Sequence, residues 1–289
     1  MLAVGFPGQG GQKVGMTQQI SPTALDLFEE ASKILGYDLL ALCNNGPAEK
    51  LNATEYAQPA MLVTCYAIWQ TVAEQMSVDV FIGHSLGEIT ALVAAGAIEF
   101  ADGVRLVAKR GELMSKSPVT GGMSAVIGLD AVQVEELCQA ASAFGEIDIA
   151  NYNSPGQIVV SGENKALEYL AQQAVEAGAR RVIPLAVSGP FHSPLMKTAA
   201  QEFAEFLDQL SFSTPLIPVV SNHRNQLITT AEEIKSELVE QLTSPVRWID
   251  NILLLESMGV NELKEISPNS VLIGLTKRIS KTISLSLVS

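Results

Sequence analysis

The feature that most constrains this chain is a serine between two glycines, where an apolar strand passes into a helix. Residues 78–82 predict a strand, residues 83–87 read Gly-His-Ser-Leu-Gly, and residues 88–96 predict a helix. This motif forms a sharp turn that raises the serine hydroxyl above the sheet, at a helix N-terminus that favours negative charge. We therefore predict that Ser85 is a nucleophile, with the N–H of Leu86 as one donor to the oxyanion. The alternative is a tight turn with a capping serine.

The amino-acid composition is that of a folded globular chain. Of the 289 residues, 47% are hydrophobic and 17% are charged, which excludes disordered, fibrous and coiled-coil classes. The 31 acidic residues exceed the 18 basic residues, so the formal charge is −13. Proteins that bind nucleic acid or a membrane surface usually carry a basic excess, so we expect neither kind of partner.

The lack of a recognisable signal peptide and the spacing of the cysteines indicate a cytoplasmic protein. The first residues lack the basic segment of a signal peptide, and the apolar stretch at 89–98 is too short to span a bilayer. Cys43, Cys65 and Cys138 are odd in number and widely spaced, so they predict neither a disulfide framework nor a zinc site. Each is expected to be a small buried residue. We expect a monomer without a metal site.

The strand and helix patterns predict an α/β chain. Strands 2–6 and 78–82 are short, nearly continuous apolar runs, which are typical of a parallel sheet with helices on both faces. Further helices are expected at 23–35, 58–75, 101–115, 194–210, 231–241, 246–258 and 271–282, and further strands at 217–221 and 262–266.

A second unit is predicted within this chain. Strands are expected at 123–128, 147–152, 157–161 and 181–187, with helices at 130–144 and 163–177. The resulting order, β-α-β-β-α-β, is the ferredoxin-like pattern. We therefore predict that residues 120–189 form a small inserted subdomain, while residues 1–119 and 190–289 form a larger α/β subdomain.

Three histidines are candidates for the base that a serine nucleophile needs. His84 adjoins Ser85 in a turn where successive side chains diverge, so we expect it to pack beside the turn. His223 lies in a polar turn and is expected to be exposed. His192 lies at the junction of the two predicted subdomains, where a cleft would form. We therefore favour His192 as the base, the alternative being an ordinary, partly buried loop histidine.

A guanidinium is predicted to face inward from the helix at 101–115. Arg110 falls within the apolar stripe of this helix. The stripe consists of Leu106, Val107, Leu113 and Met114. A buried guanidinium needs a partner, which is either an internal acid or a substrate carboxylate that arginine can bind in bidentate fashion. The periodicity does not decide between the two.

Several segments together resemble the malonyl-CoA:acyl-carrier-protein transacylases. In chain order they are Phe6-Pro7-Gly8-Gln9-Gly10, Gly83-His84-Ser85-Leu86-Gly87-Glu88, Arg110-Gly111 with Met114, Asn153-Ser154-Pro155-Gly156-Gln157, Gly189-Pro190-Phe191-His192-Ser193, Gln241-Leu242 before Pro245-Val246-Arg247-Trp248, and Gly274-Leu275 before Lys277-Arg278-Ile279. The resemblance runs in order over nearly the whole chain, which a stray serine turn would not produce.

The resemblance implies a hydrolase-like large subdomain, a ferredoxin-like insert and a ping-pong reaction. Ser85, activated by His192, would take the malonyl group from coenzyme A and pass it to the phosphopantetheine thiol of an acyl carrier protein. Arg110 would bind the malonyl carboxylate, and Gln241 would orient His192 through its carbonyl, in place of the acid of a Ser-His-Asp triad. The coenzyme A thioester is a substrate, and no cofactor is implied.

The resemblance also implies how the acyl group is held. The backbone N–H groups of Gln9 and Leu86 would form the oxyanion hole. Phe191 and Met114 would shape the selectivity for the acyl group, because a bulky Phe191 leaves little room for a 2-methyl group.

The chain departs from the family pattern in places that leave the pathway open. Gly11 stands where many members carry serine, and Ser-Pro-Asn at 267–269 stands where Gly-Pro-Gly is common. Fatty-acid synthesis and a trans-acting acyltransferase of a polyketide synthase both remain possible roles. An editing acyl-thioester hydrolase would not need Arg110. A non-catalytic carrier-docking protein would not need Ser85 and His192 as well.

Overall fold

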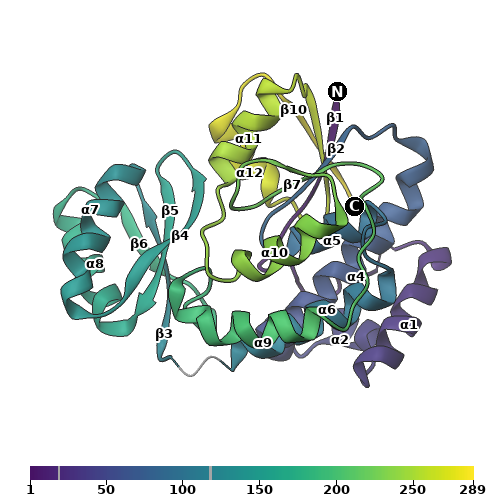
Figure 1. Ribbon diagram of the computed structural model, residues 1–289, viewed down its shortest axis with the longest axis horizontal. Helices are drawn as coiled ribbons and strands as arrows, with labels where there is room; N and C mark the ends of the chain where they lie inside the picture. The colour runs from purple at the N-terminus through teal and green to yellow at the C-terminus, as the bar shows by residue number, and fades with distance from the viewer. Residues whose placement is uncertain (19, 117–118) are drawn as a thin grey trace.

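A mainly parallel β-sheet with helices on both faces forms the larger part of the protein (Figure 1). The computed structural model describes residues 1–18, 20–116 and 119–289. The strands of this large sheet are β1 (Leu2–Phe6), β2 (Val80–Gly83), β7 (Val219–Val220), β8 (Leu227–Ile228), β9 (Glu262–Ile266) and β10 (Ser284–Val288). Their order is β10-β9-β1-β2-β7-β8. All neighbours pair in parallel except β7 and β8, which are antiparallel.

Helices cover both faces of the large sheet. They are α1 (Leu25–Leu35), α2 (Leu39–Asn45), α3 (Ala48–Asn52), α4 (Thr54–Val72), α5 (Leu86–Ala94), α6 (Phe100–Ser115), α9 (Lys197–Leu207), α10 (Ala231–Gln241), α11 (Trp248–Ser257) and α12 (Leu272–Ile279), with short 3₁₀ turns η1 (Pro22–Ala24), η2 (Ala73–Gln75) and η4 (Pro194–Met196). Because strand side chains alternate between faces, Phe6 and Phe81 join the core with α4, α5 and α6. Ala3 and Val80 join the core with α11 and α12 on the opposite face.

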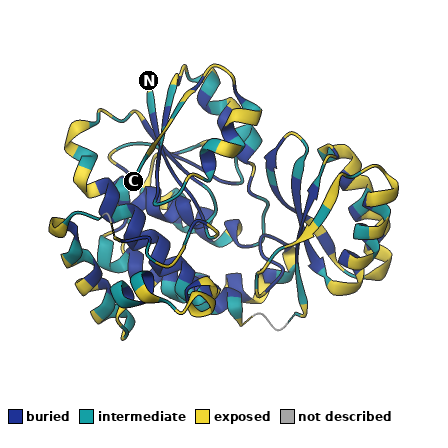
Figure 2. Ribbon diagram, turned by 180° about the vertical axis from the view of Figure 1, so that it is seen from behind, coloured by how far each residue is buried: buried dark blue, intermediate teal, exposed yellow. Residues whose placement is uncertain are grey.

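A separate antiparallel sheet forms the smaller part of the protein. Its elements are β3 (Gly121–Ile127), α7 (Ala131–Ala141), η3 (Ser142–Phe144), β4 (Ile147–Ser154), β5 (Gln157–Glu163), α8 (Asn164–Glu176) and β6 (Arg181–Pro184). The strand order β4-β5-β3-β6, with antiparallel pairing throughout, is the ferredoxin-like arrangement. A core of its own includes Val126, Val160 and Leu170. The outer faces of α7 and α8 are largely exposed (Figure 2).

The α/β fold class with a ferredoxin-like insert is confirmed. The small sheet starts at Gly121 and ends at Pro184, so it falls within the predicted segment 120–189. The subdomain boundaries themselves stay a prediction, and Ser117 and Pro118 of the expected junction loop lie outside the described residues.

Short elements account for most differences from the predicted pattern. The sequence analysis missed α2, α3, β8 and β10, and it extended the last helix to residue 282, whereas α12 ends at Ile279. The tail then forms β10, parallel to β9 at the edge of the sheet. Its alternation of serine and leucine suits an edge strand, but five residues carry too weak a signal to separate from a fraying helix end.

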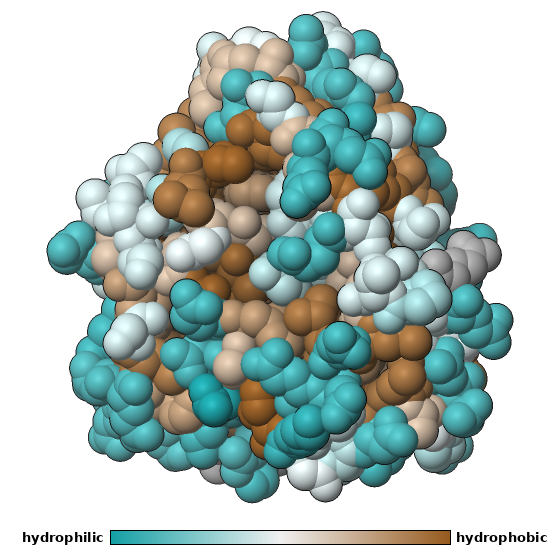
Figure 3. Space-filling model, turned by 90° about the vertical axis from the view of Figure 1, so that its right-hand side faces the viewer, coloured by the Kyte–Doolittle hydropathy of each residue, from teal (hydrophilic) through white to brown (hydrophobic). Residues whose placement is uncertain are grey.

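The cysteines and the surface fit the expectations for a globular chain. Cys43, Cys65 and Cys138 are buried and free, and burial raises the pKa of each thiol, to about 12 for Cys43 and Cys138. None of the helices described here is both long and apolar enough to cross a bilayer. Hydrophobic and hydrophilic residues are interspersed on the face shown in Figure 3.

Two glycines allow β1, β2 and α5 to meet backbone against backbone. A Cβ atom on Gly83 would lie 1.9 Å from the carbonyl carbon of Gly87. A Cβ atom on Gly87 would lie 1.9 Å from the backbone oxygen of Phe6. No side chain can shift to relieve either clash, so the turn that carries Ser85 requires glycine at both positions.

We expect Gly87→Ala to lower the free energy of unfolding by about 3 kcal/mol or more, because the methyl group overlaps backbone atoms of β1. Gly274→Ala is the matched control, since a Cβ atom there meets nothing within 4 Å in the middle of α12. We expect that control to raise stability by about 0.5–1 kcal/mol. Urea unfolding followed by circular dichroism measures both, and equal stability of Gly87→Ala and the parent chain would contradict this reading of the turn.

Candidate active site

The backbone at Ser85 adopts a conformation that is rare for a residue with a side chain. Ser85 is the N-cap of α5, with φ 53° and ψ −112°, and such strain costs on the order of 1–3 kcal/mol. The Ser85 N–H donates to Asn222 Oδ1 at 2.6 Å, and Asn222 Nδ2 donates to the backbone oxygen of Gly83 at 2.7 Å. The buried Asn222 side chain thus clamps both sides of the turn.

The structure brings together the predicted hydroxyl and imidazole. Ser85 Oγ lies 2.7 Å from His192 Nε2, and His192 Nδ1 lies 2.8 Å from the backbone oxygen of Gln241. A carbonyl oxygen can only accept, so Nδ1 carries the proton and Nε2 presents its lone pair to the hydroxyl. His192 also has a positive φ of 57°. This geometry allows the imidazole to take the serine proton.

Burial keeps the imidazole neutral. Burial, assisted by the nearby charge of Arg110, lowers the pKa of His192 to about 3, although the hydrogen bond to Gln241 opposes that shift. A base must be unprotonated to act. His192 is therefore ready to accept a proton throughout the neutral pH range.

Arg110 is buried with its side chain directed toward the same point. Its Nη2 donates to Gln241 Oε1 at 2.8 Å and lies 3.3 Å from Ser85 Oγ, while Nη1 donates to Gln58 Oε1 at 2.9 Å. Burial lowers the pKa of Arg110 to about 10, so the group stays charged at neutral pH. Among the described residues no acid forms an ion pair with it, and its Nε has no hydrogen-bond partner. The internal salt bridge, one of the two alternatives for Arg110, is therefore absent from this part of the chain.

One cavity of about 410 Å³ joins these groups. Its wall includes Ser85, Arg110 and His192, together with four further predicted site residues, Gln9, Leu86, Met114 and Phe191. The remaining one, Gln241, contacts Arg110 and His192 but is not part of the wall. Leu86 is the first residue of α5, so its N–H has no acceptor within the helix. The Gln9 side chain turns toward Thr54 Oγ1, at 3.3 Å. Backbone N–H groups at this rim can stabilise an oxyanion that forms on a carbonyl bound beside Ser85.

The other two histidines have different surroundings. His84 Nε2 lies 2.8 Å from Asn153 Oδ1, and its ring lies 5.6 Å from that of Trp248, so it packs beside the turn as expected. The prediction that His223 is exposed is wrong. Its side chain is only 11% exposed, because α10 brings Glu237 and Glu240 against its two nitrogens, at 2.9 and 3.0 Å.

The sequence analysis missed three residues that shape the site. Gln58 and Glu88 are polar residues inside otherwise apolar helical runs, and that contrast is the signal that could have identified them. Asn222 follows the short strand β7 in a polar turn, and nothing in the sequence separates it from a surface residue. No group of three or more His, Cys, Asp or Glu in the described parts of the chain is arranged to hold a metal ion.

The fold and the chemistry of this cavity define an acyltransferase. The acyl transferase domain model matches residues 5–284. A malonyl CoA-acyl carrier protein transacylase of Salmonella typhimurium is 44% identical over 97% of this chain and 93% of its own length. The Bacillus subtilis protein of the same name is 42% identical over 100% of this chain and 93% of its own length.

Solved structures agree with the sequence comparison. An acyl carrier protein S-malonyltransferase from Vibrio cholerae superimposes with a TM-score of 0.95 at 43% identity, covering 100% of this chain and 96% of that one. A malonyl-transacylase in complex with its type II polyketide acyl-carrier protein gives a TM-score of 0.96 at 43% identity, covering 99% and 95%. The chain belongs to the acyl transferase domain family and, within it, to the malonyl-CoA:acyl-carrier-protein transacylases.

We expect the imidazole of His192 to be neutral and that of His223 to be positively charged at pH 6. The lowered pKa of His192 keeps it neutral, with the proton on Nδ1. Burial opposes a positive charge on His223, but the hydrogen bonds to Glu237 and Glu240 and the charge of Glu237 together raise its pKa above the ordinary value of about 6.5. NMR of histidine-labelled protein between pH 5 and 8, a range of about 1.5 units to either side of that ordinary value, distinguishes the two states. A His192 ring that titrates near its ordinary pKa would contradict the burial argument.

Proposed function

We propose that this protein transfers a malonyl group from coenzyme A to the phosphopantetheine thiol of an acyl carrier protein, through an ester on Ser85. The observation that carries the proposal is that one cavity joins a serine hydroxyl, a neutral imidazole and a buried guanidinium without an acidic partner among the described residues. The names of the relatives, and the carrier protein bound in one related structure, support the same substrates.

In the first half-reaction Ser85 takes the acyl group. The malonyl carboxylate pairs with Arg110, which places the thioester carbon beside Ser85 Oγ. The hydroxyl attacks this carbon as its proton passes to His192 Nε2, and the N–H groups of Gln9 and Leu86 stabilise the oxyanion. The intermediate then collapses, the carbon–sulfur bond breaks, and the coenzyme A thiolate takes the proton from His192.

In the second half-reaction the carrier thiol replaces coenzyme A. Its sulfur attacks the seryl ester carbon while His192 accepts the thiol proton, and Ser85 recovers a proton as the ester bond breaks. The backbone oxygen of Gln241 holds the imidazole in one tautomer throughout, which is the task of the acid in a Ser-His-Asp triad. We infer that this carbonyl is sufficient because His192 is buried and its orientation is already fixed.

The walls of the cavity account for selectivity in this proposal. Phe191 and Met114 are both buried and line the cavity, so an acyl group with a 2-methyl branch would need one of them to move. An editing hydrolase is disfavoured because Arg110 has no acid to neutralise it in the described chain, and a neutral acyl group would leave that charge unmatched. Fatty-acid synthesis is the role we favour; the cytoplasmic location and the monomeric state stay predictions.

We expect Ser85→Ala to form no covalent adduct with malonyl-CoA, because no other hydroxyl approaches His192 Nε2 in the described structure. Intact-protein mass spectrometry after mixing with malonyl-CoA measures the adduct. Ser257→Ala is the matched control, since Ser257 is exposed at the end of α11. A malonyl adduct of equal yield in Ser85→Ala and in the control would overturn the assignment of the nucleophile.

We expect Arg110→Ala to lower kcat/KM for malonyl-CoA by about 100-fold or more, as for the loss of a buried charge pair. Transfer from acetyl-CoA, which has no carboxylate, should fall much less. Arg105→Ala on the same helix is the matched control, because Arg105 is exposed and paired with Asp102. Steady-state kinetics with both donors provide the test, and equal losses for the two donors would remove the carboxylate-binding role.

A further inference from the structure

The reaction described above leaves one buried acid beside the site without a role. Glu88 is the third residue of α5, one turn from Ser85, and its side chain is 0% exposed. The rest of that helix is almost entirely apolar, and a buried carboxyl group is costly unless it is hydrogen-bonded. Its Oε2 accepts a hydrogen bond from Gln241 Nε2 at 2.5 Å, which connects it to the groups that hold His192 and Arg110.

The contacts of Gln241 fix which way its amide points. Nε2 donates to Glu88 Oε2 and to the backbone oxygen of Ser85, at 3.2 Å, while Oε1 accepts from Arg110 Nη2 at 2.8 Å. The opposite orientation would turn the amide oxygen toward two acceptors and the NH₂ group toward the guanidinium, so it would lose all three bonds. Gln241 therefore holds His192 with its backbone and Arg110 with its side chain.

A second buried acid lies against Glu88. Glu237 on α10 is 0% exposed, and its carboxyl group lies close enough to that of Glu88 for a protonated oxygen of one to donate to the other. Among the described residues neither Glu88 Oε1 nor Glu237 Oε2 has another hydrogen bond of good geometry, although Arg224 Nε lies 3.4 Å from Glu237 Oε2. Two carboxylates cannot donate to each other, so a proton shared between these two oxygens satisfies both.

The surroundings place that proton on Glu88. Burial, and then the neighbouring Glu237, raise the pKa of Glu88 well above its ordinary value. Burial, the largest influence, acts in the same direction on Glu237, but the hydrogen bond and charge of His223, together with the contacts of Glu88 and Ser221, outweigh it and lower the pKa of Glu237. Glu88 is thus the neutral acid of the pair and Glu237 the anion.

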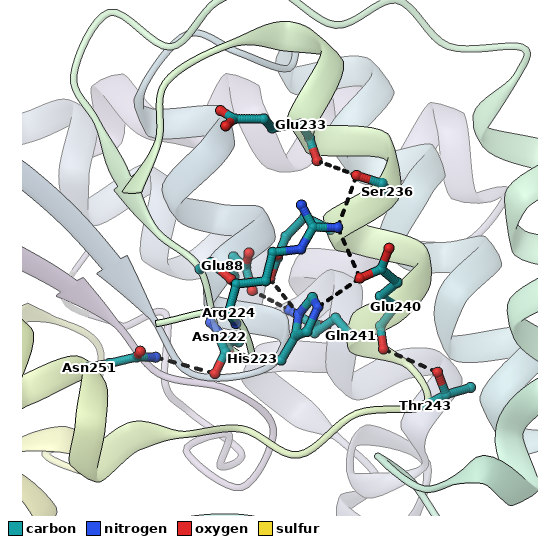
Figure 4. Close-up of polar contacts among 12 residues, drawn as sticks. Glu88, Asn222, His223, Arg224, Glu233, Ser236, Glu240, Gln241, Thr243 and Asn251 are labelled. Carbon is teal, nitrogen blue, oxygen red and sulfur yellow. Dashed lines mark hydrogen bonds and ion pairs between the residues drawn. The ribbon is translucent and has the colours of Figure 1, made fainter. Parts of the chain in front are cut away.

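The charges beyond Glu237 cancel one another. His223 bridges Glu237 and Glu240, so both of its nitrogens face carboxylates and the ring is an imidazolium. Arg224 Nη2 contacts Glu240 Oε2 at 2.9 Å, and Arg224 Nε lies 3.4 Å from Glu237 Oε2. Figure 4 shows Glu88 and Gln241 beside His223 and Arg224, with dashed lines from His223 and Arg224 to Glu240. Within these ion pairs two cations and two anions balance, so with Glu88 protonated they present no net negative charge to Arg110.

We propose that Glu88 is a positioning residue for the transfer reaction: its protonated carboxyl group, held by Glu237, fixes the Gln241 amide with Oε1 toward Arg110 and leaves the guanidinium charge free for the carboxylate of the acyl donor. The inference rests on the proposed malonyl transfer. Glu88 touches no reacting atom and acts through Gln241.

Two substitutions at Glu88 test the importance of its hydrogen bonds, because one retains both bonds and the other removes them. In Glu88→Gln, the amide oxygen can still accept from Gln241 and the NH₂ group can donate to Glu237, as the protonated acid does. In Glu88→Leu neither bond can form. We expect Glu88→Gln to keep kcat/KM for malonyl-CoA within about 3-fold of the parent, and Glu88→Leu to lower it by about 10- to 100-fold, mainly through KM. Acetyl-CoA transfer should fall much less.

The donor preference is the readout that a merely structural role would not move. A Glu88→Leu protein that retains the parent ratio of malonyl to acetyl transfer would overturn the proposal, and so would a Glu88→Gln protein as impaired as Glu88→Leu. Glu265→Gln is the matched control, because this acid is also 0% exposed and accepts three backbone N–H groups at the start of α12, away from Gln241 and Arg110. We expect that control to lose stability without a change in the ratio.

Glu237→Gln tests the charge without removing any side chain at Glu88. Its NH₂ group would donate to Glu88, which then becomes an ionised carboxylate near Arg110 and competes with the donor. We expect KM for malonyl-CoA to rise about 5-fold or more, and Glu88→Gln/Glu237→Gln to reverse most of that rise. An unchanged KM for malonyl-CoA in Glu237→Gln would contradict the proposal. This result decides the matter even if the Glu88→Leu protein fails to fold and cannot be assayed. Absence of malonyl transfer by the parent chain would instead refute the proposed function.

Discussion

A buried positive charge without an acidic partner in the described structure is the constraint on which the site depends. The neutral amide oxygens of Gln58 and Gln241 hold the guanidinium of Arg110 in place but do not neutralise it. Desolvating such a charge is costly, and the folded chain recovers that cost only in part. A donor that brings its own carboxylate supplies the missing partner, whereas a neutral acyl group does not. The preference for a thioester with a free carboxylate thus follows from two features together: the buried guanidinium of Arg110, and the lack of an acidic partner for it among the described residues.

The cavity lies between the two sheets, and its apolar walls strengthen the effect of the buried charge of Arg110. Met123 of β3 and Leu185 and Val187 beyond β6 line it from the side of the small sheet, opposite the turn at Ser85. Apolar walls lower the local dielectric constant, so the attraction between a bound carboxylate and Arg110 is stronger than at a surface. They also limit the access of water to a seryl ester, which a transferase must protect from hydrolysis. The same desolvation keeps His192 neutral.

The features of the fold and site that could be predicted from the sequence are those that depend on local patterns. The turn at Ser85 follows from an apolar strand, two glycines and a helix in direct succession, and the inward direction of Arg110 follows from helical periodicity. The sheet order of the insert follows from its β-α-β-β-α-β pattern. The short elements α2, α3, β8 and β10 have too few residues to show a period, and their presence depends on what they pack against.

Contacts between distant segments account for what the sequence could not provide. Helical periodicity left open whether an acid or a substrate would contact Arg110. In the structure its guanidinium donates to two neutral amide oxygens, those of Gln58 on α4 and Gln241 on α10. The clamp of Asn222 on Ser85 and the burial of His223 arise because the segment after β7 folds against α5 and α10. A polar turn in the sequence gives no sign of such packing.

The most direct test of this account is a crystal structure of the protein after reaction with malonyl-CoA. The account requires an ester on Ser85 Oγ, its carbonyl oxygen facing the N–H groups of Gln9 and Leu86, and the free carboxylate within hydrogen-bond distance of the Arg110 guanidinium. A seryl ester whose carboxylate points to solvent, with Arg110 still bound only to Gln58 and Gln241, would contradict it.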